Sequence, residues 1–330
     1  MNPSVSIILI NWNGWKESIE CLESLFQIDY TNYNVILVDN DSKDGSIDKI
    51  KEYCNGEIKI TSKFVEYDTN NKPLDVIEYT EKEICNNKRK ELDQQTKNLI
   101  LIKNDSNYGF AEGNNIAIKY SMKNLNPDYV LLLNNDTVVA PDFLSKLIDK
   151  AKINGNIGVV GPKIYYYDYN GENNYIWFAG GKTNLKKFPG YFHWNEEIIN
   201  SPTELTDNFF VCDWISGAAM MVKADILEKF FLDNKYFFGA EDVDLCMKIK
   251  DDGYKIFCVA ESVIWHKVSV SRKKKYNGNK IREIKELGLN NLKFLRYNTS
   301  FLFFIFMIPI YIIQISRIMD HLKMILNNTK

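Results

Sequence analysis

Short apolar runs alternate with amphipathic stretches through the first half of the chain. Between the runs, apolar residues recur at helical spacing, as Ile19, Leu22 and Phe26 do. The runs themselves are about as long as β-strands and are apolar on both faces, as strands of a parallel sheet covered by helices must be. The pattern therefore predicts an α/β fold with a mostly parallel sheet flanked by helices. The predicted strands are Val5–Ile10, Val35–Val38, Leu99–Ile102, Tyr129–Leu133 and Gly158–Gly161.

Three segments depart from this alternation. Residues 62–98 are polar and dense in charge, which predicts a partly helical surface insertion. The aromatic and glycine-rich stretch Tyr165–Trp214 favours a smaller set of antiparallel strands over the functional edge of the sheet. After Gly239 the pattern predicts one helix, two short strands and a basic tail; these elements are Glu241–Asp252, stopped by Gly253, then Lys255–Val259 and Val263–His266.

Composition adds limits on the class of protein. The chain has 330 residues, of which 45% are hydrophobic, so it can bury a sizeable core in two domains or in one large domain with an appendage. Its six cysteines form no CxxC pair, which favours reduced thiols over a disulfide scaffold or a zinc framework. They are Cys21, Cys54, Cys85, Cys212, Cys246 and Cys258.

The net charge of −2 is an average over two unlike parts. Residues 267–330 hold 13 Lys and Arg against three acidic residues, a net charge of +10, which leaves −12 for residues 1–266. The acidic body gives no support for a nucleic-acid partner. The N-terminal apolar run lacks a preceding basic segment and breaks after six residues, so it predicts a buried strand rather than a signal peptide. The main body of the protein is therefore expected to be cytoplasmic.

Polar motifs follow four successive predicted strands. They begin with Asn11, Asp39, Asn107 and Asn134, and each is rich in Asn, Asp, Ser or Gly. Any one of them could simply make a turn or cap a helix. Because ligands of open α/β sheets bind at the carboxyl ends of the strands, their coincidence predicts a shared ligand site there.

Six runs taken together resemble the family 2 glycosyltransferases, in particular their rhamnosyltransferase-like branch. In chain order they are VSIILINWNG, VDNDSKDGS, NYGFAEGNN, LLLNNDTVV, CDWISGAAMMVK and FFGAEDVDLCMKIKDDGYKIFCVAESVIWHKVS. The resemblance covers about residues 4–270, apart from the 62–98 insertion. It implies a GT-A-type fold, with residues 1–163 as a nucleotide-sugar-binding half, 164–270 as an acceptor-binding and catalytic half, and 271–330 as a C-terminal helical tail.

The resemblance implies a nucleoside diphosphate-sugar donor and a divalent cation, Mg²⁺ or Mn²⁺. The family's Asp-X-Asp motif falls on Asn134, Asn135 and Asp136, so Asp136 would be its single carboxylate ligand. His266 matches a histidine that reaches the metal and would favour Mn²⁺, although a hydrogen-bonded core histidine is the alternative. The further positions implied at the donor are Asn11, Asn13, Asp39, Asn40, Ser42, Asn107, Gly109, Gly113 and Asn114, with Asp39 placed at the base; loop geometry alone is the alternative for the two glycines.

Glu241 and Asp242 match the family's catalytic pair. The resemblance implies that Asp242 is the base that deprotonates the acceptor hydroxyl in an inverting transfer, with Glu241 positioning the acceptor. A helix start that simply favours acids is the alternative. Asp213, Trp214 and Gly217 match the acceptor-side loop, where Trp214 either stacks on a sugar or belongs to the core.

The tail combines basic clusters with a short apolar run. Arg272–Lys275 precede Phe301–Ile313, which as a 13-residue helix would reach about 20 Å of a hydrocarbon core of about 30 Å. Peripheral attachment to the anionic inner face of the cell membrane is therefore favoured. A span continuing through Met319, and packing on the catalytic domain or in a homo-oligomer, stay open.

The sequence thus predicts a metal-dependent, inverting, membrane-associated glycosyltransferase. It would move a sugar, UDP- or dTDP-linked, to a hydroxyl of a glycan or lipid-linked acceptor in cell-surface polysaccharide or glycoconjugate synthesis. A nucleotidyltransferase that makes activated sugars is one alternative. A non-catalytic sugar-nucleotide-binding partner of another transferase is a second, suggested by Asn134 in place of an acid.

Overall fold

One large mixed sheet forms the centre of the computed structural model, which describes residues 2–86, 98–186, 191–193, 208–237, 239–268 and 279–328. Within those residues the strand order is β11-β13-β7-β12-β5-β1-β2-β4-β3, with β6 beside β13 and β8 beside β7. The strands are β1 (Val5–Asn11), β2 (Tyr33–Asp39), β3 (Asp75–Thr80), β4 (Asn98–Lys103), β5 (Tyr129–Asn134), β6 (Thr137–Val139), β7 (Ile157–Tyr166), β8 (Ile176–Phe178), β11 (Phe209–Cys212), β12 (Ala219–Lys223) and β13 (Lys255–His266). All five predicted strands are confirmed.

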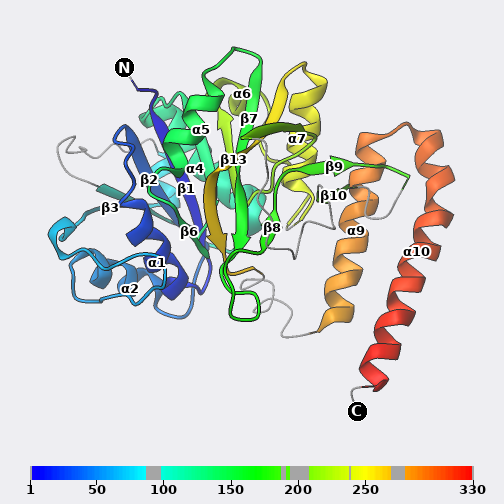
Figure 1. Cartoon of the computed structure of the whole chain (residues 1–330), viewed down its shortest axis with the longest axis horizontal. Helices are drawn as coiled ribbons and strands as arrows, with labels where there is room; N and C mark the ends of the chain where they lie inside the picture. Colours follow the sequence, from blue (N-terminus) through cyan, green and yellow to red (C-terminus); the bar gives the residue numbers. More distant parts are fainter. Residues whose placement is uncertain are drawn as a thin grey trace.

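Helices pack on both faces of this sheet (Figure 1), which explains why its central strands are apolar on both sides. They are α1 (Trp15–Leu25), α2 (Ser46–Cys54), α3 (Glu81–Cys85), α4 (Gly109–Asn124), α5 (Phe143–Ala151), α6 (Ala224–Lys229), α7 (Glu241–Asp251), α9 (Lys280–Asn298) and α10 (Phe301–Asn328), with a short 3₁₀ turn at Thr69–Asn71. A separate pair, β9 (Gly181–Thr183) and β10 (Tyr191–His193), is antiparallel.

Five neighbouring strands of the sheet run parallel, so their carboxyl ends share one edge; in sheet order they are β3, β4, β2, β1 and β5. In that register Asn11 lies beside Asp39, and Ile10 beside Asn134. The antiparallel strand β12 follows between β5 and β7, and β13 runs parallel to β7. The strand order therefore gathers the polar motifs of the first half and brings the end of β13, with His266, to the same region.

The segment 62–98 differs from the expected surface insertion. It adds β3 to the edge of the sheet, parallel to β4, and a capping box of Thr80 and Glu83 then starts α3. Within β3 only Tyr79 is buried, so the strand is too polar to be recognised from its pattern. Residues 87–97 lie outside the described part of the chain. The two short strands expected after α7 are one strand, β13, with a register shift between Val259 and Val263.

Five of the six cysteines are described with their side chains, and all five are free and buried: Cys21, Cys54, Cys212, Cys246 and Cys258. Burial raises the pKa of the Cys21, Cys54 and Cys212 thiols to about 12. These side chains act as small apolar groups of the core.

Helices α9 and α10 form a C-terminal hairpin and lie side by side at one end of the molecule (Figure 1). Leu295, Met307 and Tyr311 form a small core between the two helices, and the Tyr311 hydroxyl donates to the Leu185 carbonyl oxygen at 3.2 Å. Phe294 of α9 belongs to the main core. The sequence left open a span through Met319, but within the described residues no helix has the length and apolarity to cross a bilayer. The basic cluster Arg272–Lys275 lies outside those residues.

Candidate active site

A cavity of about 390 Å³ opens at the carboxyl edge of the parallel strands. Its lining includes four amide side chains, which we call the amide wall: Asn40, Asn107, Asn134 and Asn135. It also includes Gly217, Glu241 and Asp242, which we call the carboxylate wall. Asp136, His266 and Gly109 also line the cavity. Ten of the sequence-predicted site residues thus meet around one space, although they are spread over 227 positions, from Asn40 to His266.

A network of hydrogen bonds behind the amide wall joins the ends of β1 and β2. The buried Asp39 carboxylate accepts from the Asn11 amide at 2.6 Å and from the Ser42 main-chain N–H at 2.9 Å. The Asn13 N–H donates to the Ser42 hydroxyl oxygen at 2.8 Å. Asn11, Asn13, Asp39 and Ser42 are therefore brought together, but they shape the loops beside the cavity and are not among its lining residues.

Asn40 joins this edge to the start of α4. Its amide donates to the Gly109 carbonyl oxygen at 2.9 Å, and its side-chain oxygen accepts from Asn104 at 2.7 Å. A Cβ at Gly113 would lie 2.8 Å from the Asn40 amide nitrogen, so the glycine is needed for close packing. Asn114 is buried and donates to the Phe110 carbonyl oxygen, away from the cavity. Gly113 and Asn114 thus support the loop from behind.

Asn135 ties the amide wall to α1. Its amide donates to the Ser18 hydroxyl oxygen at 2.8 Å and to the Asn11 side-chain oxygen at 3.3 Å. It is buried, with 7% of its surface exposed. Its orientation is fixed before any ligand binds, as a preorganised site requires.

Asp136 and His266 form the best candidate for a cation site. His266 Nε2 lies 3.0 Å from Asp136 Oδ1 and 3.4 Å from the Asn134 amide nitrogen. Burial alone would raise the pKa of the Asp136 carboxyl, but His266, the Asp136 main chain and the Lys267 ammonium group together outweigh burial and lower that pKa.

A carboxylate and an imidazole are acceptable ligands for Mn²⁺ or Mg²⁺. Among the described residues, no group of three or more His, Cys, Asp or Glu side chains could enclose a metal. The pair therefore fits a cation that takes most of its ligands from phosphate oxygens and water.

Glu241 and Asp242 begin α7 directly after a tight turn. The turn places Gly239 at φ 92° and Ala240 at φ 77°, a conformation that costs a non-glycine residue free energy. Asp242 accepts from the Gly217 N–H and from the Val243 N–H, both at 2.9 Å. Glu241 is 5% exposed, and its Oε2 has no hydrogen-bond partner among the described residues.

Burial raises the pKa of both carboxyls in this pair. The pKa of Glu241 rises to about 8, through burial first and then the neighbouring Asp242 carboxylate. Two adjacent acids that resist ionisation are typical of a proton-transfer site, although ion-pair networks also shift pKa values.

Two of the three expected acceptor-side residues do not line the cavity. Trp214 is 4% exposed, packs against Gly181 and the Phe178 ring, and donates from its indole N–H to the Lys182 carbonyl oxygen. Because β9 covers the ring, its burial favours the core alternative for Trp214 over sugar stacking. Asp213 pairs with Lys250 and accepts from the Thr183 N–H, which joins α7 to β9. Gly217 does line the cavity.

Four aromatic residues that sequence reasoning missed also line the cavity: Trp12, Phe110, Trp177 and Phe237. The Trp177 ring meets the His266 imidazole edge to face, with centroids 4.6 Å apart. The Phe237 carbonyl oxygen accepts from the Phe110 N–H at 3.0 Å. An aromatic residue within a strand pattern is usually predicted to belong to the core. Only Trp12, which lies between polar residues, had a sequence signal that could have placed it at the site.

Comparison with known proteins agrees with this arrangement. Residues 6–72 and 81–230 match the family described as Glycosyl transferase family 2. The chain belongs to this family. Its family 2 region includes the amide wall, Asp136 and Gly217, whereas Glu241, Asp242 and His266 lie beyond the matched residues.

Individual relatives are distant. The chain is 26% identical over 182 residues to the O-antigen biosynthesis protein RfbC of Myxococcus xanthus, a match of 53% of this chain and 13% of that protein. It is 27% identical over 166 residues to the rhamnosyltransferase WbbL of Escherichia coli, covering 46% of this chain and 58% of WbbL. These two matches span 13% and 58% of the relatives' own length, less than two thirds in both cases.

Among solved structures, the mannosyltransferase PcManGT of Pyrobaculum calidifontis, in complex with GDP-Man and Mn²⁺, has a similar fold. The TM-score is 0.54 at 16% identity, over 91% of this chain and 66% of PcManGT. This likeness confirms the GT-A-type arrangement of a mostly parallel sheet flanked by helices.

Proposed function

We propose that this chain is a metal-dependent glycosyltransferase that moves a sugar from a nucleoside diphosphate donor to an acceptor hydroxyl. One observation carries the proposal. The Asp136–His266 pair, suited to a cation, and the Glu241–Asp242 pair, suited to proton transfer, open into the same cavity. PcManGT, whose fold is similar, is described with GDP-Man and Mn²⁺, which supports a nucleotide-sugar and a cation here.

The proposed transfer is a single displacement with inversion. The acceptor oxygen bonds to the anomeric carbon of the sugar while the bond from that carbon to the diphosphate breaks, and the hydroxyl proton passes to the Asp242 carboxylate. Gly217 and Val243 hold that carboxylate from behind with their N–H groups. Glu241, protonated at neutral pH, donates a hydrogen bond to the acceptor.

Asp136 and His266 would hold the cation. When bound, it supplies positive charge to the diphosphate as that group leaves. The Asn134 amide nitrogen lies 3.4 Å from His266 Nε2, the same ring nitrogen that faces Asp136. The donor base would lie against the loops that Asp39, Asn11 and Asn13 hold, and a UDP- or dTDP-linked sugar is the proposed donor.

The test is a panel of UDP-, GDP- and dTDP-sugars with the purified full chain. We expect one donor to raise the thermal midpoint in the presence of Mn²⁺ and to release its nucleoside diphosphate slowly by hydrolysis. Asp136→Ala should lose both effects, whereas Asp142→Ala, at an exposed ion pair, should keep them. Release of pyrophosphate from a nucleoside triphosphate would favour the nucleotidyltransferase alternative. Donor binding without hydrolysis or transfer would favour the non-catalytic partner.

We also propose that the C-terminal hairpin attaches the enzyme to an anionic membrane surface, where it meets a glycan or lipid-linked acceptor. Leu302 is 82% exposed and Phe306 70%, one helical turn apart on α10. The same exposed face of α10 continues through Ile305, Ile312 and Ile313. An apolar face of this extent on a surface helix is unusual without a partner.

The basic residues of the C-terminal hairpin favour an anionic membrane as the partner of this apolar face. Over residues 279–317 of the two helices the sequence has six Lys and Arg against two Glu, and the Arg296 guanidinium lies over the Phe301 and Phe304 rings. A basic rim around an apolar face suits anionic headgroups above a hydrocarbon layer.

Vesicle sedimentation tests this attachment with the full chain. We expect binding to phosphatidylglycerol vesicles and weak binding to phosphatidylcholine. The double variant Leu302→Glu/Phe306→Glu should lower the partition coefficient at least roughly tenfold, because two large side chains no longer leave water. Ile153→Glu, at an exposed apolar position after α5, is the matched control. A dimer in light scattering that the double variant dissociates, without vesicle binding, would assign the face to a second copy instead.

A further inference from the structure

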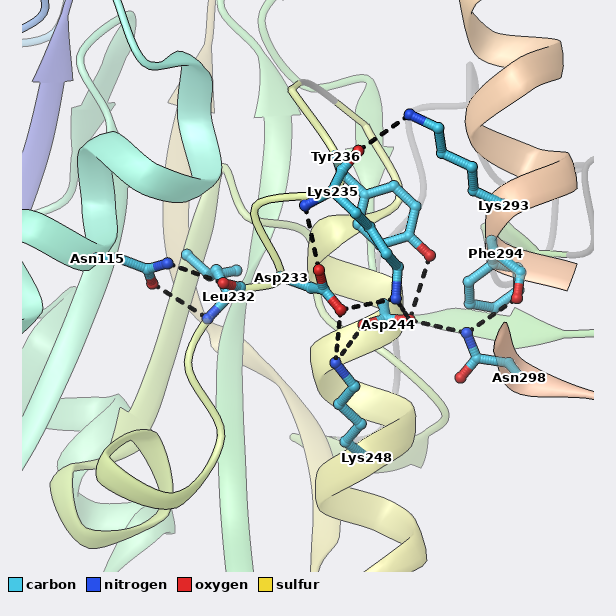
Figure 2. A network of polar contacts seen from close by, with 10 residues as sticks. All are labelled: Asn115, Leu232, Asp233, Lys235, Tyr236, Asp244, Lys248, Lys293, Phe294 and Asn298. Carbon is cyan, nitrogen blue, oxygen red and sulfur yellow. Dashed lines mark hydrogen bonds and ion pairs between the residues drawn. The ribbon is translucent and has the colours of Figure 1, made fainter. Parts of the chain in front are cut away.

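A cluster of polar side chains lies where the first turn of α7 meets α9, behind the carboxylate wall. At its centre the Asp244 carboxylate, 1% exposed, accepts from the Asn298 amide at 2.8 Å and from the Tyr236 hydroxyl at 3.2 Å. It also forms an ion pair with Lys248 at 2.7 Å. Figure 2 shows these groups converging on Asp244 from α7, from the preceding loop and from α9.

Charge is balanced in this cluster. Asp233 pairs with Lys235 at 2.7 Å and with Lys248 at 3.3 Å. Burial alone would lower the pKa of Lys248, but its ion pairs with Asp244 and Asp233 outweigh burial and raise it, so the ammonium group stays charged. The two carboxylates of the cluster are thus paired with two ammonium groups.

The loop between Leu232 and Ala240 depends on such restraints. Asn115 of α4 fixes its start through two hydrogen bonds with the Leu232 main chain, at 2.8 and 3.1 Å (Figure 2). Its middle is fixed by the hydrogen bond from the Phe110 N–H to the Phe237 carbonyl oxygen. A Cβ at Gly109 would lie 2.4 Å from that oxygen, so only glycine allows this approach. The loop ends in the left-handed turn of Gly239 and Ala240, directly before Glu241.

The contribution of α9 comes from far along the sequence. Asn298 is 54 residues from Asp244, and a second hydrogen bond runs from the Lys293 ammonium group to the Lys235 carbonyl oxygen at 3.1 Å. Phe294, fully buried in the main core, anchors the helix between these two contacts. The C-terminal hairpin is thus bonded both to the catalytic helix and to the loop that leads into it.

We propose that Asp244 and Asn298 are positioning residues, through which α9 sets the pose of Glu241 and Asp242. Asp244 lies three residues after Glu241 on the same helix, so the two are neighbours on its surface. A rotation of the first turn of α7 would move the carboxylate wall relative to Asp136, and a misplacement of about 1 Å can cost roughly a hundredfold in rate. The inference rests on the proposed glycosyltransferase function and assigns the hairpin a catalytic task besides attachment.

An isosteric variant separates positioning from packing. Asn298→Asp keeps the shape of the side chain but replaces the amide donor with a carboxylate facing Asp244. We expect kcat for transfer to fall roughly tenfold or more, with the KM and Kd of the donor found in the panel unchanged, because the amide wall is untouched. The kcat of Asn298→Ala should fall less than that of Asn298→Asp, because alanine places no second carboxylate beside Asp244. Leu289→Ala, at a position of the same helix that is 61% exposed, is the control and should match the wild type.

Reversing the pair gives the decisive arm. In Asp244→Asn/Asn298→Asp the amide and the carboxylate exchange places, so kcat should recover relative to the Asn298→Asp single variant. Equal kcat for Asn298→Asp and wild type would overturn the inference. So would losses of kcat and thermal midpoint that the reversed pair does not restore. Absence of transfer by the wild type would instead contradict the proposed function.

Discussion

The two walls of the cavity are held in place by different means. Behind the amide wall, Asn11, Asp39 and Ser42 bond to one another across the ends of neighbouring parallel strands. In the carboxylate wall, Glu241 and Asp242 follow a left-handed turn, and their helix is bonded to the distant helix α9 through Asp244. One wall is therefore built into the sheet, and the other is held by an appendage. We infer that changes behind the first wall affect folding and donor binding together, whereas changes behind the second affect turnover.

The largest effect should come from the base itself. Asp242→Asn keeps the hydrogen bond from the Gly217 N–H but cannot take the acceptor proton, so transfer should fall about 10³-fold. Donor affinity, measured by calorimetry with Mn²⁺, should stay within about twofold of the wild type. Transfer above a tenth of the wild-type rate would contradict the assignment of Asp242 as the base.

The raised pKa of Glu241 predicts a stability difference that depends on pH. In the folded state this carboxyl keeps its proton up to about pH 8, whereas in the unfolded chain it ionises near its ordinary value of 4.5. Folding stability should therefore fall as the pH rises between these values and then level off. Glu241→Gln cannot ionise, so it should equal the wild type near pH 4 and exceed it by roughly 3–5 kcal/mol at pH 9.

Urea unfolding at pH 4, 7 and 9 measures this difference. The charged groups that act on Glu241 are Asp242 and Asp244, and neither is changed in the variant. Glu228→Gln, at an exposed position of α6, is the control and should show no such divergence. A constant offset between Glu241→Gln and wild type across the three pH values would contradict the raised pKa.

Behind the amide wall, Asp39→Ala should weaken folding and binding together. The substitution leaves the Asn11 amide and the Ser42 N–H without their shared acceptor in a buried place, which should cost about 2–3 kcal/mol of unfolding free energy. The same loss of loop shape should weaken donor binding. Asp48→Ala, at an exposed position of α2, is the matched control. A variant of normal stability with weakened binding would show that Asp39 serves the ligand alone.

The smallest effect is expected at the ion pair of Asp213 and Lys250. The Lys250 side chain is half exposed, so Lys250→Ala should lower stability by less than about 1 kcal/mol. Asp213 keeps its bond from the Thr183 N–H in that variant. Transfer kinetics should be unchanged, because neither residue lines the cavity. A rise in the KM of the acceptor would restore the acceptor-side role expected from the sequence.

The same comparison explains what the sequence could predict. The five apolar strands were predictable because burial on both faces leaves a continuous apolar run, and the amide wall followed from the polar residues at their ends. The meeting of Asp136 and His266, 130 residues apart, came from resemblance to a family rather than from spacing.

Other features depend on contacts that no local pattern records. The strand β3 is too polar to be recognised, and the bond from Asn298 to Asp244 joins helices that nothing in the sequence pairs. Trp214 lies in the core because β9 covers it, whereas Trp177, of the same residue type, lies at the cavity. A residue type alone could not separate these two tryptophans.

The burial of the cysteines has a practical consequence. Thiol reagents react with the thiolate form of cysteine. The five described cysteines are buried in the core, and burial raises the pKa of their thiols, which disfavours the thiolate. With Cys85 replaced by serine, a single cysteine introduced at an exposed position such as Leu302 should take up a maleimide dye far faster than the native thiols. Because the native thiols react slowly, a single fluorophore at the introduced cysteine can report the environment of the C-terminal hairpin.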